Sequence, residues 1–459
     1  MSLDRRHFLG AAAGGLLGAT ALPELIDRLA GAAPARAAAA AVPHVEQHLL
    51  DGVTLIRQDG VEVLVPPLHH AIVTARVRAT DLAAARRDLE DALRSLEARY
   101  PPTPAGLGIT VAWGLPYFRK HVAAAARAHL PFDRRARKPA LLDARRFPSD
   151  PKATLLEQND VVVLLRSDHV AHVRDAERSL FDRLDVFERT SVRHGFVGGG
   201  FKEGPGLPKL LAQRAGVPGA DLIPDGAELF LGFTSTQKAA LGPSKIANHE
   251  TLGYVDLRRS GYFHGGTHMH LSHIHEDLEA WYLGLDFAER VTTMFKPGLD
   301  VKVGTQAVGQ GPRAVSSAAA LARSASVHGR FGHSASIQPT SRLQQDVVGP
   351  DGTRYPKGTA IPQRADFNSL DNPFAWSATP KRDGLAQDAS ASLHFVSFNP
   401  SSDDFHRNRL AMDGVMPGGK RLPTSGQYSR GFNEILRTTH RQNFLVPPRR
   451  HRSFPLSEL

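Results

Sequence analysis

The sequence predicts an α+β fold made of two β-α-β-β-α-β units with antiparallel sheets, the arrangement called ferredoxin-like. Two observations predict it. Short strand-like runs and amphipathic helical runs follow one another in this order through the first half of the chain, and a similar order recurs in the second half. We expect the first unit to span residues 41–205 and the second unit residues 206–459. Helices on one face of each sheet would leave a pocket in which a flat cofactor could sit.

The first unit begins with a strand at residues 71–77, where apolar and polar residues alternate as they do in a half-buried strand. Thr80 or Asp81 is expected to cap the helix that follows, because leucine and alanine then recur on one helical face. The later elements of this unit are expected at residues 109–113 (strand), 160–165 (buried strand), 168–184 (helix) and 186–192 (strand).

The second unit shows a similar order with a long interruption. Its strands are expected at residues 228–233, 266–275 and 393–398, and its helices through Trp281, at residues 287–295 and from about Ser402. Residues 297–388 are rich in Gly, Pro, Ser and Asn, so we expect little regular structure there. An irregular region of that length is usually functional rather than a simple connection.

Residues 1–40 have the features of a twin-arginine signal peptide. Arg5 and Arg6 precede an Ala/Gly/Leu run over residues 10–21, and residues 35–37 offer small side chains for cleavage. A run of about 12 residues is too short to span a bilayer, so no stable membrane anchor is expected. The motif predicts recognition by the twin-arginine translocase and export of the folded protein to the periplasm, the cell envelope or the outside of the cell. The alternative is a disordered Ala-rich tail.

The composition excludes several kinds of chemistry. The chain has no cysteine, which rules out disulfides, thiolate catalysis, iron–sulfur clusters and cysteine-ligated haem. Its net charge of +10 comes from lysines and arginines spread along the chain, with no nucleic-acid-binding motif. We therefore expect a solvated basic surface and no nucleic-acid partner. The 22 histidines are the best candidates for chemistry.

A histidine-rich strand is predicted within residues 263–276. Because side chains alternate along a strand, His268 and His270 point to one face, and His273 and His275 point to the other. This division argues against a single metal site, and the segment lacks the second histidine of the zinc-protease motif. We expect polar positions on a half-exposed strand, with a zinc or copper site as the alternative.

Three further segments carry little information when each is taken alone. A glycine-rich run at residues 195–205 lets the backbone turn sharply or approach a ligand, but it fits neither a P-loop nor a dinucleotide-binding fingerprint. His333, in the segment GHSASIQP, and the segment IPQRADFN at residues 361–368 match no general motif. A plain turn and an ordinary buried or surface histidine remain the alternatives at this stage.

Taken in order, these segments resemble the dye-decolourising (DyP-type) family of haem peroxidases over most of the chain after residue 40. GGGFKEGPGLP is similar to the family's signature Gly-x-x-Asp-Gly followed by proline, and IPDGAELFLGF is similar to the strand after it. GGTHMHLSHIHEDLEAWY is similar to the family's Gly-Gly strand and acidic, Trp-containing helix. His333, with Pro339 six residues later, matches the proximal-histidine segment, and IPQRADF stands where the family carries its distal arginine. ITVAWGLPYF and QNDVVVLLRSDHVAHVRDA in the first half are also similar.

The resemblance implies one haem b per chain, held in the second unit with His333 as the iron ligand. It implies that Glu203 moves a proton between the oxygens of hydrogen peroxide, and that Arg364 stabilises the charge that builds up as the O–O bond breaks. Asp366 is a second polar candidate in the same pocket, and a small organic reductant would supply electrons. The other haem contacts are expected beside Glu203: Gly200, Phe201, Lys202 and Gly204.

Glu203 stands where the resembled family has aspartate. One extra methylene moves the carboxylate by roughly 1.5 Å, which is enough to change the rate of proton transfer. Two alternatives to a peroxidase follow: a haem-binding or haem-handling protein with little peroxidase activity, and a non-haem metal-binding protein that uses the histidine-rich strand. Trp281, Trp113 or a surface tyrosine is a candidate electron relay, and the resemblance allows a homo-oligomer.

Overall fold

The computed structural model describes residues 26, 46–58, 61–197, 205–233, 245–246, 261–298, 317–343, 345–348, 354–355, 357, 361–385, 388–425 and 431–459. The predicted signal peptide lies outside these residues except for Ile26, which is buried in one hydrophobic cluster with Leu211 and Trp281. This contact exists only while the predicted signal peptide remains attached. Within the described part of the chain, no helix is both long enough and apolar enough to cross a membrane.

The first half folds in the order that the sequence predicts. Its main elements are strand β3 (His69–Val77), helix α3 (Leu82–Arg99), strand β4 (Gly108–Gly114), strand β8 (Val161–Ser167), helix α6 (Val170–Glu177) and strand β9 (Phe187–Phe196). Asp81 caps α3, because its carboxylate accepts hydrogen bonds from the N–H groups of Ala83 and Ala84 at 3.0 Å. The buried face of α3 matches the predicted periodicity, with Ala85, Leu89, Leu93 and Leu96.

The second half contains most of the predicted elements at the expected places. These are strand β11 (Thr267–Glu276), helix α8 (Leu278–Leu283), helix α9 (Phe287–Met294), strand β17 (Ala391–Asn399) and helix α14 (Ser402–Met412). The sequence analysis did not identify the long C-terminal strand β18 (Leu436–Val446). The shorter elements elsewhere are β1 (Thr54–Gln58), β2 (Val61–Val65), α4 (Leu115–Lys120), α5 (Ala123–His129), β5 (Phe132–Asp133), β6 (Lys138–Pro139), β7 (Leu155–Leu156), α7 (Leu207–Arg214), β10 (Lys245–Ile246), β12 (Val347–Val348) and β13 (Arg354–Tyr355).

The strand predicted at residues 228–233 is wrong, because this segment forms turns and bends. Its carbonyl groups bind helix α8 instead of a neighbouring strand. The indole N–H of Trp281 donates to the carbonyl of Leu231 at 2.9 Å, and the hydroxyl of Tyr282 donates to that of Phe230 at 2.7 Å. Gly232 turns the chain with a φ of 82°, a conformation that glycine adopts without strain.

The expectation of little regular structure in residues 297–388 is also wrong for the described part of that region. It contains α10 (Ala318–His328), α11 (His333–Ser341), β14 (Gln363–Arg364), β15 (Phe367–Leu370), α12 (Asp371–Phe374), β16 (Ala375–Ser377) and α13 (Pro380–Asp383). Ser317 caps the alanine-rich helix α10, because its hydroxyl accepts a hydrogen bond from the N–H of Ala320 at 3.2 Å. Gly329 ends this helix with a φ of 66°.

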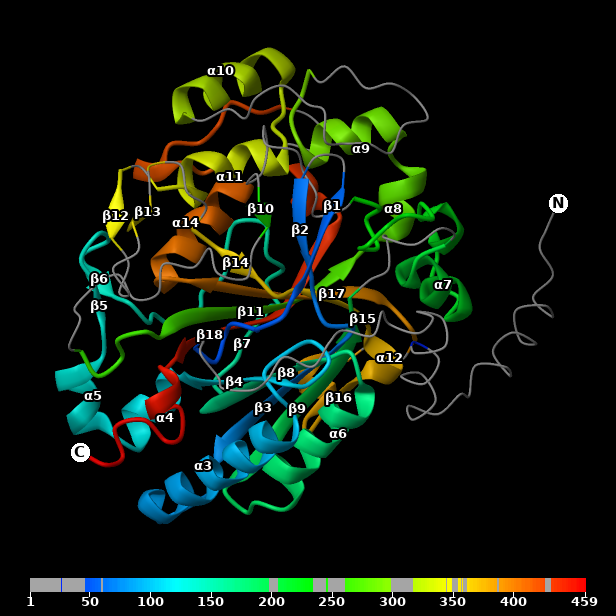
Figure 1. The fold of residues 1–459 in the computed structure, drawn as a ribbon. Coiled ribbons are helices and arrows are strands. Elements are labelled where there is room, and N and C mark those ends of the chain that lie inside the picture. The colour runs from blue at the N-terminus through cyan, green and yellow to red at the C-terminus, as the bar shows by residue number, and fades with distance from the viewer. Residues whose placement is uncertain are drawn as a thin grey trace.

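The long strands of both halves close into one antiparallel barrel, which occupies the middle of the molecule in Figure 1. Their order is β11-β17-β15-β9-β3-β8-β4-β18, and the circle closes because β18 also pairs with β11. The first half supplies the arc β9-β3-β8-β4, and the second half supplies β15-β17-β11-β18. The division into two ferredoxin-like units at residues 41–205 and 206–459 stays a prediction.

The interior of the barrel is apolar toward one end and polar toward the other. The apolar part is one cluster of side chains: Ile72, Ala112, Val162, Leu164, Met269, Leu271, Phe367, Val396, Phe398, Phe444 and Val446. Farther along these strands, the inward side chains are polar and buried: Arg193, His273, His275, His394, His440 and Gln442. Outside the barrel, α3 and α6 lie on one side, and α9, α11 and α14 lie on the opposite side (Figure 1).

Candidate functional site

Strand β11 lies between the barrel interior and helix α14, so both of its faces are buried. His270 faces outward, where its ring stacks on Phe405 of α14 with the ring centroids 3.3 Å apart. His273 and His275 lie on the inward face, at the same alternation as Leu271 of the apolar cluster. The predicted division of the histidines between two faces is confirmed. The predicted half-exposed strand is wrong, because α14 covers the outer face.

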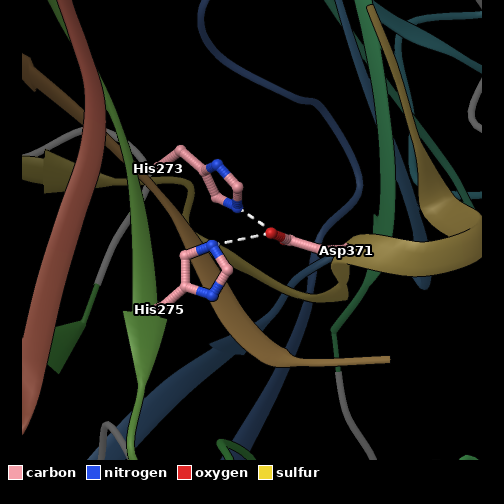
Figure 2. Close-up of side chains that lie close together, drawn as sticks. All are labelled: His273, His275 and Asp371. Carbon is pink, nitrogen blue, oxygen red and sulfur yellow. Dashed lines mark hydrogen bonds and ion pairs between the residues drawn. The ribbon is translucent and has the colours of Figure 1, made fainter. Parts of the chain in front are cut away.

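The two inward histidines point at one carboxylate, as Figure 2 shows. Nε2 of His273 lies 2.6 Å from Oδ1 of Asp371, and Nε2 of His275 lies 2.7 Å from Oδ2. All three side chains are buried, and one potential ligand atom from each lies within 4.8 Å of the others. Although burial alone raises the pKa of Asp371, the neighbouring His273 and His275 hold it well below its usual range. Two imidazoles and a carboxylate in this arrangement can hold a divalent metal ion.

Sequence reasoning missed Asp371 because it follows His273 by 98 residues and lies in a region expected to be irregular. Nothing local in that region marks the carboxylate as a partner of the histidines. The useful signal was the spacing of His273 and His275. Two histidines two residues apart on a strand share a face, and a shared buried face requires a partner from another strand.

On the outer side of the barrel, His333 is the first residue of helix α11. Its ring packs against Phe432 with ring centroids 4.5 Å apart. Its Nδ1 atom is buried and makes no hydrogen bond to any residue that the structure describes. Burial lowers the pKa of His333 to about 3, and the nearby charges of Arg364 and Arg409 contribute to this shift. The imidazole is therefore neutral at physiological pH, the state in which histidine binds metals.

Arg364 and Asp366 lie around strand β14, which pairs with β17 so that Arg364 is opposite Ser397. An Nη1 atom of Arg364 lies 3.6 Å from Oδ2 of Asp366, and 42% of the arginine side chain is exposed. Burial raises the pKa of Asp366, and the charge of Arg364 opposes this effect. Arg364 is therefore an ion-pair neighbour of Asp366, and its charge also acts on His333. The roles assigned to these residues stay predictions.

The predicted carboxylate Glu203 and its neighbours Gly200, Phe201, Lys202 and Gly204 lie outside the described residues. The chain on either side is anchored. The N–H of Val197 donates to the carbonyl of Leu68 at 2.9 Å, and the N–H of Gly206 donates to the carbonyl of Asp225 at 2.7 Å. The roles assigned to these glycine-rich residues stay predictions.

Of the predicted electron relays, Trp113 and Trp281 are completely buried. Trp113 belongs to the core of the first half, where its indole N–H donates to the carbonyl of Arg452 at 2.9 Å. Trp281 lies nearer to His333, since its ring centroid is 6.5 Å from that of Phe432, which contacts the histidine. Of the two, Trp281 is therefore the better placed to pass electrons toward His333.

The described residues fit the iron-ligand side of a haem site. His333 offers a neutral imidazole, and a buried nitrogen without a hydrogen bond is costly unless a ligand occupies the site. Phe432 packs against the imidazole, and Arg364 supplies a positive charge nearby. These features suit a large planar anionic cofactor bound between the helices and the outer face of the barrel.

Comparison with known proteins identifies the family of the chain and the kind of fold it has. The model of a family of unknown function, DUF7405, matches residues 67–448. No curated protein matches the sequence. The structure is similar to a DyP-type peroxidase from Cellulomonas bogoriensis, with 19% sequence identity, 86% of this chain and 94% of that chain covered, and a TM-score of 0.53.

Two other solved structures are similar at lower scores. A variant of DypB from Rhodococcus jostii RHA1 in complex with heme has 12% identity, with 89% of this chain and 99% of that chain covered and a TM-score of 0.49. A dye-decolorizing peroxidase from Bacteroides thetaiotaomicron VPI-5482 has 13% identity, with 87% and 98% covered and a TM-score of 0.46. The resemblance predicted from the sequence motifs is confirmed as a similarity of fold.

Proposed function

Because the chain belongs to DUF7405, a family of unknown function, and has a fold like that of a DyP-type peroxidase, we propose that it is a haem-dependent peroxidase that reduces hydrogen peroxide and oxidises a small organic donor. The single observation that carries this proposal is the state of His333. It is a neutral imidazole with an unbonded buried nitrogen, at the position that the family resemblance assigns to the iron ligand. The predicted ferredoxin-like duplication is part of the same proposal.

In this proposal one haem b per chain is held through His333. When bound, the haem iron would supply the electron-transfer chemistry that peroxide cleavage needs. The low pKa of His333 keeps its lone pair free for the iron at any pH above about 3. Helix α11 and Phe432 fix the orientation of the imidazole, whose Nδ1 atom is buried.

The remaining residues handle charge and protons. Arg364 places a cation where negative charge would build up on the peroxide oxygens, and its partial exposure lets it reach a small ligand. Glu203 takes a proton from one peroxide oxygen and returns it to the other, so that water can leave. Asp366 is a second carboxyl close to Arg364, and burial raises its pKa toward the protonated form that can donate a proton.

The test is the visible spectrum of the full-length protein purified from haem-sufficient cells, with and without hydrogen peroxide. We expect a strong Soret band that shifts on addition of peroxide, together with peroxide-dependent oxidation of a dye or phenol. His333→Ala should lose the Soret band. His328→Ala is the matched control, because His328 is exposed at the end of neighbouring helix α10. Haem-reconstituted protein that oxidises no dye or phenol would refute the enzymatic part of the proposal.

The substitution of glutamate for aspartate at the signature position favours a second candidate, a haem-binding or haem-handling protein with little peroxidase activity. It predicts normal haem binding and a spectrum that does not change with peroxide. Glu203→Asp separates the two candidates. A large rise in turnover would show a peroxidase site in which the longer side chain slows proton transfer, whereas no rise would favour haem handling.

Export by the twin-arginine pathway is the second part of the proposal. The pathway carries folded proteins, so a non-covalent haem inserted in the cytoplasm could cross the membrane inside a closed site. Changing Arg5 and Arg6 together to lysine should leave haem-loaded protein in the cytoplasm. Equal export of haem-free protein from haem-starved cells would contradict the link between haem loading and export.

A further inference from the structure

We propose that His273, His275 and Asp371 form a binding site for a zinc ion inside the barrel. This site is separate from the proposed haem site, because its three residues converge inside the barrel, whereas His333 begins helix α11 outside it (Figure 1). The inference does not depend on haem binding or on peroxidase activity. It assigns a role to a buried histidine cluster that the proposed peroxidase reaction does not use.

The distances within the cluster are those of an ion-paired triad that small shifts would convert into a metal site. His273 and Asp371 are hydrogen-bonded at 2.6 Å. Nε2 of His275 is only 2.7 Å from Oδ2 of Asp371, yet within the described residues that oxygen accepts no hydrogen bond of good geometry. The nitrogen and the oxygen lie close without being aligned to each other, as expected of ligand atoms directed at a common point. Zinc bonds of about 2.0–2.2 Å would place ligand atoms roughly 3.3 Å apart. Each imidazole nitrogen therefore has to move away from its carboxylate oxygen by less than about 1 Å, and ligand atoms that lie up to 4.8 Å apart have to approach each other.

Each proposed ligand also makes a further hydrogen bond, which for the two histidines lies on the side away from the carboxylate. Nδ1 of His273 is 2.9 Å from the hydroxyl of Thr439, and Nδ1 of His275 is 2.9 Å from that of Ser390. The hydroxyl of Ser392 donates to Oδ1 of Asp371 at 2.8 Å. In metal sites, such outer contacts select the tautomer of a histidine ligand, so that its other nitrogen faces the ion. Here they leave both Nε2 atoms facing the carboxylate (Figure 2).

A further buried histidine, His394 of strand β17, lies beside the cluster. It is paired with His273 across the β11–β17 ladder, and their rings stack with centroids 4.6 Å apart. The group whose ligand atoms lie within 4.8 Å of one another is His273, His275 and Asp371, without His394. The proposed site therefore offers two imidazoles and one carboxylate, and the fourth position of a tetrahedral zinc ion is left to water.

The charges around the cluster leave one carboxylate for a cation. Arg193, beside the cluster, is paired with the buried carboxylate of Glu157. The charge of Arg193 is therefore compensated by Glu157, and the negative charge of Asp371 is left to offset part of the charge of zinc.

A pocket lies near the cluster and is lined in part by Thr74, Glu157, Asn159 and Ser191. Glu157 of this pocket is paired with Arg193, whose charge acts on the ring of His273. The three proposed ligands are themselves buried, so we expect zinc to exchange slowly.

The experiment uses the full-length protein expressed with added Zn²⁺ and dialysed against a chelator, and it measures metals by mass spectrometry. We expect about one zinc per chain in the wild type. Asp371→Asn, which preserves the shape of the side chain, and His275→Gln should weaken zinc binding by at least roughly 100-fold, because each removes a ligand. His268→Gln is the matched control, since His268 is equally buried on the outer face of the same strand.

A second measurement keeps the test valid if a variant folds poorly. After extended removal of metal, added Zn²⁺ should raise the melting temperature of the wild type and of His268→Gln, but not that of Asp371→Asn. His333→Ala should keep its zinc whether or not it loses haem, so that failure of the haem proposal can be told apart from failure of this one. The zinc site is refuted if the wild type neither retains zinc nor is stabilised by it, if Asp371→Asn and His275→Gln retain zinc equally well, or if a metal other than zinc is bound at one per chain.

Discussion

Asp150 is a buried carboxylate that ties helix α14 to the barrel, and its removal tests how the proposed haem side of the molecule is held. Its Oδ1 accepts hydrogen bonds from Nη2 of Arg441 in β18 at 2.7 Å and from Nη2 of Arg409 in α14 at 3.1 Å. Its Oδ2 accepts one from the N–H of Phe147 at 2.8 Å. The side chain of Asp150 is fully buried, and those of Arg409 and Arg441 are only 7% and 1% exposed.

Asp150→Ala should therefore leave an uncompensated buried charge. Burial lowers the pKa of Arg441 only to about 10, so that its guanidinium stays charged at pH 7. In this variant Arg409 keeps a second carboxylate partner, Asp413, at 2.8 Å. Among the described residues, the side chain of Arg441 keeps one hydrogen bond, to the hydroxyl of Thr438 at 3.1 Å. Breaking a buried ion pair by removing one partner costs about 3–5 kcal/mol. We expect a loss of stability in that range.

The assay is urea unfolding of the wild type and the variants at pH 7, followed by circular dichroism. The matched control is Asp143→Ala, because Asp143 forms a similar bidentate pair with Arg119 at 2.6 and 3.1 Å, but on the surface. The two side chains of that pair are 58% and 49% exposed, so the control should cost less than about 1 kcal/mol. The reasoning fails if Asp150→Ala destabilises the protein no more than Asp143→Ala does.

Three further predictions test other parts of the structure. Burial lowers the pKa of His48 from 6.5 to about 3, so between these values the unfolded chain binds more protons than the folded chain. The free energy of unfolding should then fall as the pH drops through this window, by up to about 1.4 kcal/mol per pH unit from this group. In His48→Gln the free energy of unfolding should fall less steeply with decreasing pH, and a slope equal to that of the wild type would contradict the prediction. Asp81→Ala removes the cap of α3 and should cost about 1 kcal/mol in urea unfolding, while an effect below a few tenths would show that the cap is unimportant. A Cβ at Gly195 would lie 2.3 Å from the carbonyl oxygen of Asn368 and from the ring of Phe367. Gly195→Ala should therefore destabilise the protein at the junction of β9 and β15 by about 1–3 kcal/mol. If the variant were as thermally stable as the wild type, the junction would have to adjust freely.

The first half of the fold was predictable because its signals are local. Alternation over residues 71–77 and the 3.6-residue repeat of α3 are each patterns within one element, so both elements were placed correctly. The expectation that the strand is only half-buried is wrong, because Ile72 and Thr74 on its second face are buried inside the barrel. The strand expected at residues 228–233 failed for a non-local reason. The apolar run at residues 228–233 is compatible with a strand and with a turn. Trp281 and Tyr282 of α8 donate hydrogen bonds to the carbonyl groups that a neighbouring strand would otherwise have paired. Periodicity carries no information about such competition.

The same distinction explains what was found of the candidate sites. The side-chain alternation of β11 is local, so the two faces of its histidines were predicted correctly. Closure of the barrel joins β11 to β18, and no pattern within either strand specifies that pairing. This closure buries the inner face of β11 and helix α14 buries the outer face, and neither contact can be read from the strand alone, so the strand was expected to be half-exposed. The convergence of His273 and Asp371 is equally non-local, because it depends on the pairing of β11 with β17 and of β17 with β15.

The register of β11 connects the two proposed sites. Sliding the strand by one residue would bring every inward side chain to the outer face, moving His275 away from Asp371 and His270 away from Phe405 of α14. The ladder with β18 shifts register between His273 and Ile274, so the strand is irregular beside the proposed zinc ligands. A zinc ion bound by residues of β11 and α12 would fix this irregular stretch from the inside. The bonds between zinc and its ligands would also hold the outer face of β11 in place, on which α14 packs. Zinc would therefore support the haem side of the barrel without contacting haem.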